Sequence, residues 1–147
     1  MKERKIKNVF KDGAISPEAI AKSIANHQSK TDIGAHNIFL GQVRADEIEG
    51  KKVRAIEYSA YEEMVNEKMH IIREETFEKF NLSCMHIYHS LGEVKAGEIC
   101  LFVFVSSPRR KEVFKALEYL VKRIKSEAPI FGKELFEDQT HQWKVNS

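Results

Sequence analysis

One stretch at residues 98–106, EICLFVFVS, constrains the fold more strongly than any other part of the sequence. In an extended strand, successive side chains point to opposite faces. Here the odd-numbered side chains from Ile99 to Val105 are apolar, and so are the even-numbered ones from Cys100 to Phe104. A strand with two apolar faces has to be covered on both sides, so this segment predicts the central strand of a layered fold.

A long amphipathic helix is predicted directly after this strand. Its apolar positions recur every three or four residues and form one stripe: Val113, Leu117, Leu120 and Ile124. Ser107 is the type of residue that caps a helix start, and Pro108 is favoured at the first helical position. Pro129 should end the helix, because the residue before a proline avoids the helical region.

The remaining elements follow from apolar periodicity and turn residues. Strands are predicted at residues 6–10, 34–43, 52–60 and 83–91, and two short strands around a turn at 137–140. Further helices are predicted at 16–26, opened by Ser16 and Pro17, and at 62–80. The order β-α-β-β-α-β-β-α-β-β predicts an α+β fold with a mixed or antiparallel sheet and about three helices, similar to an α/β-hammerhead.

Composition limits the function classes. With 147 residues and 42% hydrophobic content, we expect a single domain over residues 1–147. A formal net charge of +2 argues against non-specific nucleic-acid binding. The longest strongly apolar run, LFVFV, is too short to span a membrane, and no secretion signal is evident, so we expect a cytoplasmic protein. Cys84 and Cys100 are expected to be small buried side chains.

The histidines are scattered, and His86 and His89 should point to opposite faces of one strand. They form no metal-binding pattern, and no phosphate-binding or dinucleotide-binding glycine motif is present. We therefore expect neither a metal site nor a cofactor.

The start of the long helix carries an unusual charge pattern. Arg109, Arg110 and Lys111 follow one another where a helix already carries partial positive charge, which costs about 0.3–1 kcal/mol for each exposed cation. Arginine side chains and helix amides together form a good site for phosphate or carboxylate. On charge counting alone, a solvated basic surface remains the alternative.

Helix geometry limits how these cations can cooperate. Arg109 and Lys125 are sixteen residues apart on the predicted helix, which is about 24 Å at 1.5 Å per residue. They cannot bind the same small anion within one chain. If both serve one site, a second copy of the chain must contribute one of them, which predicts a homodimer.

Taken together, the motifs resemble the large, catalytic subunit of molybdopterin synthase. The resemblance extends over residues 34–143 and rests on the order of GAHNIFLGQVR, IEYSAYEEM, IYHSLGEVKAGE, VSSPRRKEVFKALEYLVKRIKSEAPIFGKE and EDQTHQW. It implies sulfur transfer from the C-terminal Gly-Gly thiocarboxylate of a small ubiquitin-like carrier subunit to cyclic pyranopterin monophosphate, forming the molybdopterin dithiolene. It also implies a central homodimer with one carrier at each end, a heterotetramer.

The resemblance assigns roles to particular residues. Lys125 matches the essential catalytic lysine, which would hold the carboxyl group of the carrier or attack its thiocarboxylate as an amine. Arg110 matches the arginine of a His-Arg pair supplied by the neighbouring protomer. The substrate-binding set further comprises Phe39, Gln42, Val43, Arg44, Arg109, Gly132, Lys133 and Glu134.

Two positions depart from the family pattern. The histidine of the His-Arg pair is Arg109 here, and the lysine that commonly follows an aromatic residue is Gly132, with Lys133 one position later. One step along a strand reverses the side-chain direction, so Lys133 could act as the second catalytic lysine only if Gly132 permits a bulge. Two alternatives therefore remain: a catalytically weakened homologue that still binds the carrier or an anionic pterin, and an α+β dimer with an unrelated anionic ligand.

Overall fold

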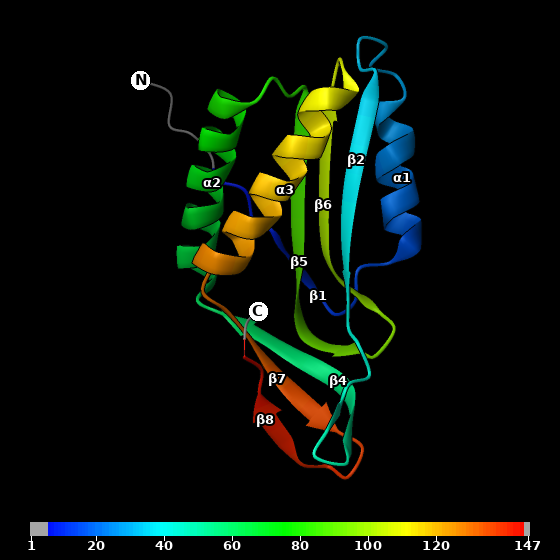
Figure 1. The fold of residues 1–147 in the computed structure, drawn as a ribbon, viewed down its shortest axis with the longest axis vertical. Coiled ribbons are helices and arrows are strands. Elements are labelled where there is room, and N and C mark those ends of the chain that lie inside the picture. Colours follow the sequence, from blue (N-terminus) through cyan, green and yellow to red (C-terminus); the bar gives the residue numbers. More distant parts are fainter. Residues whose placement is uncertain (1–5, 146–147) are drawn as a thin grey trace.

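The computed structural model describes residues 6–145 (Figure 1). The elements are β1 (Phe10–Asp12), α1 (Pro17–His27), β2 (Ala35–Gln42), β3 (Glu47–Ile48), β4 (Lys51–Ala60), α2 (Glu62–Lys79), β5 (Cys84–Lys95), β6 (Ile99–Ser107), α3 (Arg110–Glu127), β7 (Ile130–Phe136) and β8 (His141–Trp143). The predicted α+β order is confirmed, and β3 is an additional short strand that pairs with β4 where we predicted a loop.

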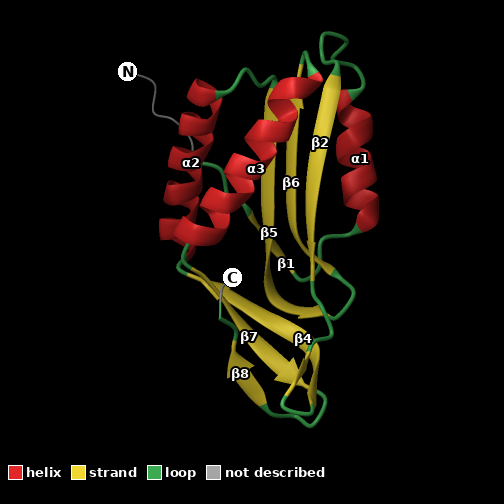
Figure 2. Cartoon of the chain, in the orientation of Figure 1, coloured by secondary structure: helices red, strands yellow, loops and turns green. Residues whose placement is uncertain are grey.

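The strands form one sheet in the order β2-β6-β5-β4-β7-β8. Neighbours on this path are antiparallel, whereas β1 pairs with β5 in parallel, so the sheet is mixed. Helices α2 and α3 pack beside each other over β5, β6 and β2, while β4, β7 and β8 extend beyond the helices as a separate corner of the sheet (Figure 2).

Strand β6 is central, as its two apolar faces predicted. Its odd-numbered side chains Leu101, Val103 and Val105 are fully buried in the larger core cluster, which includes the apolar stripe of α3. Its even-numbered side chains Phe102 and Phe104 pack with Ile20 of α1 in a second cluster. The sheet is therefore covered by α2 and α3 on one face and by α1 on the other.

Three predicted boundaries are wrong. Strand β5 runs to Lys95 instead of ending at residue 91, because residues 92–95 pair with β4. Helix α3 begins at Arg110, with Arg109 at the cap position and no side-chain cap, because Ser107 instead completes β6 opposite Ala35. The buried Ser107 hydroxyl donates to the Asn81 carbonyl oxygen at 2.9 Å. The N-terminal strand starts at Phe10 rather than at residue 6, because the Val9 N–H donates to the Asn66 side chain at 2.9 Å instead of to a strand.

Other local predictions are confirmed. Helix α1 starts at Pro17, and the Ser16 hydroxyl accepts the Ala19 N–H at 3.1 Å, as a capping serine does. Helix α2 ends at Lys79, one residue before the predicted end. Cys84 and Cys100 are free and buried.

Candidate anion-binding site

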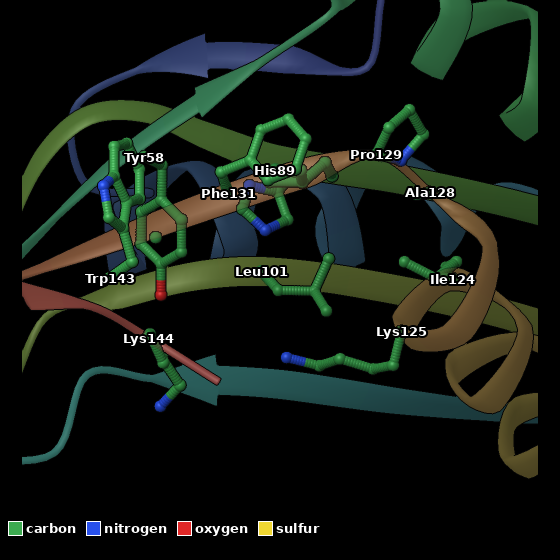
Figure 3. Close-up of a pocket in the computed structure, with 12 residues that line it drawn as sticks. Tyr58, His89, Leu101, Ile124, Lys125, Ala128, Pro129, Phe131, Trp143 and Lys144 are labelled. Carbon is green, nitrogen blue, oxygen red and sulfur yellow. The ribbon is translucent and has the colours of Figure 1, made fainter. Parts of the chain in front are cut away.

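A cavity of about 340 Å³ lies where the C-terminal end of α3 meets the corner formed by β4, β7 and β8 (Figure 3). Among the described residues 6–145, its charged lining side chains are Lys125 and Lys144, and no aspartate or glutamate lines it. Leu101 and Ile124 contribute apolar surface. A half-open, largely apolar cavity with two ammonium groups and no acidic side chain among its described lining residues is suited to an anionic ligand.

Lys125 lies in the last turn of α3 and is exposed to solvent. Its side chain extends from the helix end across the cavity, toward the side where Trp143 and Lys144 lie (Figure 3). Helix α3 ends with Ala128 at its C-cap, directly before Pro129. The chain then enters β7, so this strand begins close to Lys125. Of the residues that the sequence predicted for the site, Lys125 and Gly132 line this cavity.

Gly132 lines the cavity with its backbone atoms, because it has no side chain. It lies opposite Tyr58 of β4 in the antiparallel register. A Cβ at this position would stand 3.0 Å from Ile56 Cγ2 and 3.5 Å from the Tyr58 ring. Any side chain here would force its neighbours aside, so the glycine preserves the close packing of β4 on β7.

Lys133 does not line the cavity. It lies opposite Glu57 on one side and Trp143 on the other, with its ammonium 3.8 Å from the Glu57 carboxylate and 5.3 Å from the Trp143 ring centroid. The register of β7 against β4 is continuous from Ile130 to Leu135, so the bulge that Lys133 would need is absent from this stretch. Its predicted catalytic role remains a prediction that the geometry does not favour.

The other predicted residues lie elsewhere in the fold. Phe39 and Gln42 lie on β2, and Glu134 is buried in β7, where it accepts a hydrogen bond from Gln142 at 3.2 Å. Val43 is buried, and the exposed Arg44 forms an ion pair with Asp46 at 3.3 Å.

Arg109 and Arg110 are exposed at the start of α3, at the opposite end of the helix from Lys125. Because the helix is continuous from Arg110 to Glu127, Arg110 and Lys125 are about 22 Å apart along its axis. The register of β2 on β6 places Ala35 beside Ser107, near this helix start, and Gln42 beside Ile99, at the far end. One chain therefore does not bring Arg110 together with Lys125 or with Arg44.

His89 lies against the cavity and is buried. Burial, and to a lesser extent the charge of Lys125, lowers the pKa of His89 to about 4. Its Nδ1 lies 2.8 Å from the Ser90 carbonyl oxygen, which can only accept, so the neutral ring carries its proton on Nδ1 and leaves Nε2 as an acceptor. At neutral pH the ring adds no positive charge to the two lysines.

Tyr58 is the second titratable group in the wall. Burial, and then the hydrogen bond from its hydroxyl to Cys100 Sγ at 3.4 Å, raise the pKa of Tyr58. Its ring packs edge-on against His89 with centroids 5.0 Å apart. The phenol therefore stays neutral, and the cavity keeps its positive character.

Stability is expected to fall as the pH drops from 6.5 toward 4, because the unfolded chain protonates His89 while the folded chain does not. The slope from this residue is at most about 1.4 kcal/mol per pH unit. His86, whose pKa burial also lowers to about 4, adds a slope of the same sign. Urea unfolding at several pH values should therefore give a shallower slope for His89→Gln than for the exposed control His141→Gln. Equal slopes would contradict the assignment.

The sequence did not single out Tyr58, His89, Trp143 or Lys144. The predicted strands contain the first two, but only the register of β4, β5, β7 and β8 places them around one cavity. His86 and His89 do point to opposite faces as predicted, since His86 contacts His27 of α1 at 2.9 Å between the Nε2 atoms.

A larger cavity of about 680 Å³ lies on the α1 side of the sheet. Its lining includes Lys11, Lys30 and the His27–His86 pair, and none of the residues that the sequence predicted for the site. Over residues 6–145, no group of three or more histidine, cysteine, aspartate or glutamate side chains could hold a metal ion, and no helix is long and apolar enough to cross a membrane.

Over residues 6–145, the fold and the cavity define a class: an α+β protein with three helices and, at the C-terminal end of α3, a basic cavity lined by no acidic side chain. Comparison with known proteins gives the family. The family described as MoaE protein matches residues 11–127. The chain belongs to the MoaE family.

Individual relatives agree with this assignment. A Bacillus subtilis protein named molybdopterin synthase catalytic subunit is 37% identical over 129 residues, covering 88% of this chain and 78% of the relative. A Drosophila mojavensis protein of the same name is 39% identical over 115 residues, and the chain spans only 31% of its length.

Solved structures agree as well. The crystal structure of molybdopterin synthase from Staphylococcus aureus aligns with a TM-score of 0.79 and 30% identity, covering 96% of this chain and 99% of that one. A Helicobacter pylori complex of subunits 1 and 2 of molybdopterin-converting factor aligns with a TM-score of 0.78 at 20% identity, which supports the fold alone.

Proposed function

We propose that this chain is the catalytic subunit of a molybdopterin synthase. It transfers sulfur from the thiocarboxylated Gly-Gly terminus of a small ubiquitin-like carrier to cyclic pyranopterin monophosphate and works in the cytoplasm. The observation that carries the proposal is the position of Lys125, whose ammonium extends into a cavity that no aspartate or glutamate of residues 6–145 lines. The names of the Bacillus subtilis and Staphylococcus aureus relatives support it.

Lys125 can serve the chemistry through its charge. For each sulfur transferred, a carbon–sulfur bond to the pterin forms as a carbon–oxygen bond at the same pterin carbon breaks, and the displaced oxygen leaves as water or as a phosphate oxygen. On the carrier, the carbon–sulfur bond of the thiocarboxylate breaks and water adds to the carbonyl carbon, so the carrier ends as a carboxylate. Negative charge is present on the thiocarboxylate and on the carboxylate product. An ammonium in a largely apolar cavity stabilises such charge more strongly than one in bulk water.

The complete site requires a second copy of the chain. Arg110 lies about 22 Å from Lys125 on the same continuous helix, too far for both to contact one pterin phosphate. In a symmetric dimer, Arg110 of one protomer approaches Lys125 of its partner, and the same contact occurs twice. One carrier at each end of such a dimer completes a heterotetramer.

A second function is favoured by one specific observation. Position 132 is a glycine in a strand without a bulge, and Lys133 is engaged with Glu57 at 3.8 Å. If two lysines are needed at these positions, the chain would bind the carrier or an anionic pterin without turnover.

Reconstitution separates these functions. Purified chain is mixed with thiocarboxylated carrier and cyclic pyranopterin monophosphate, and we expect molybdopterin to form. Carrier ending in an ordinary carboxylate is the control and should give none. Carrier binding without product would favour the weakened homologue, and absence of both binding and product would reject both functions.

A further inference from the structure

The cavity contains a second lysine from a different element. Lys144 follows β8, and its backbone N–H donates to the Gly132 carbonyl oxygen at 2.8 Å. This bond continues the pairing of β7 with β8 one residue beyond Trp143. The main chain of Lys144 is therefore held against β7, and its half-buried side chain is part of the cavity wall.

The register explains why Lys144 reaches the cavity when Lys133 does not. Lys133 lies opposite Trp143, which places Lys144 opposite Gly132, and Gly132 lies opposite Tyr58. Residues opposite one another in a sheet share a face. Tyr58, Gly132 and Lys144 thus form one row across three strands, and all three line the cavity. The middle of this row has no side chain, and the side chains of Ile56 and Tyr58 pack close to the glycine.

The charges of the lining residues indicate which kind of ligand the cavity can bind. Lys125 extends into the cavity from the last turn of α3 and Lys144 lines it just beyond β8 (Figure 3), and no aspartate or glutamate is among the lining residues within 6–145. Two ammonium groups beside one cavity repel each other, and an anion between them relieves that repulsion. Within residues 6–145, Lys144 forms no ion pair with a carboxylate side chain, whereas Lys133 is paired with Glu57.

We propose that Lys144 is the second anion-binding lysine of this site and that, together with Lys125, it holds an oxyanion of the ligand. This rests on the proposed function, in which the oxyanion is either the C-terminal carboxylate of the carrier or the phosphate of the pterin. Lys144 then supplies from β8 the positive charge that the sequence led us to expect from Lys133 on β7.

Equilibrium binding to the full-length chain tests this without turnover. The ligands are a peptide ending in Gly-Gly with a free carboxylate, the same peptide with an amidated end, and inorganic phosphate. Lys144→Ala should weaken the binding of at least one oxyanion about tenfold, the effect of one charge-assisted hydrogen bond. Lys144→Arg should recover most of the affinity, because the charge returns. The control Lys122→Ala removes an exposed lysine that does not line the cavity, and it should stay within about twofold of the original chain.

Comparing the peptide with inorganic phosphate identifies which ligand group supplies the oxyanion. A loss confined to the free-carboxylate peptide assigns the oxyanion to the carrier terminus, and a loss confined to phosphate assigns it to the pterin. The inference is overturned if neither oxyanion binds the original chain, if Lys144→Ala and Lys122→Ala behave alike, or if the amidated peptide loses affinity to the same extent. A chain that makes no molybdopterin yet loses oxyanion affinity on Lys144→Ala would reject the proposed function and keep this inference.

Discussion

Replacing Lys125 with alanine is expected to lower the rate of molybdopterin formation by about 10²–10³-fold, the typical effect of removing one preorganised group that stabilises developing charge. The side chain extends into the cavity from the last turn of α3, beside the apolar residues Leu101 and Ile124. Single-turnover product formation with saturating carrier and pterin measures the effect.

Two companion variants sharpen this result. Lys122→Ala removes an exposed lysine one turn earlier on the same helix and should leave the rate within about twofold, since surface substitutions are nearly neutral. Lys125→Arg keeps the charge but cannot act as an amine nucleophile, so retained activity would assign Lys125 a charge-stabilising role. Nearly full activity in Lys125→Ala, with an unchanged unfolding midpoint, would remove Lys125 from the mechanism.

Mixing two inactive variants is expected to restore activity to about a quarter of the original, because half of randomly formed dimers are mixed and each mixed dimer has one intact site. The variants are Lys125→Ala and Arg110→Ala, each alone expected to be severely impaired. In a mixed dimer, the Lys125 of one chain meets the Arg110 of the other, so one site keeps both groups and the other site loses both.

The control for this experiment is the Lys125→Ala variant mixed with the double variant. Neither site of that mixed dimer contains Lys125, so no recovery is expected. Native mass spectrometry confirms that mixed dimers form. If they form and the first mixture stays inactive, each site lies within one chain, and the shared-site arrangement proposed from the helix length fails.

Much of the fold could be predicted from local patterns. The alternating apolar residues of β6 require cover on both faces, and α1 and α3 provide it. Ser16 and Pro17 fixed the start of α1 because capping and backbone restriction are local effects. The same reasoning failed at Ser107, since tertiary pairing with Ala35 kept that residue in the strand.

For the candidate site, too, some features follow from the sequence and others only from the tertiary structure. The sequence by itself determined that Lys125 ends a long helix and that Arg110 begins it, because helix length depends only on the residues between them. Only the tertiary structure decided that Lys144, rather than Lys133, lines the same cavity as Lys125. That choice depends on which residue of β8 lies opposite Gly132, and strand register is set by contacts between segments far apart in the chain.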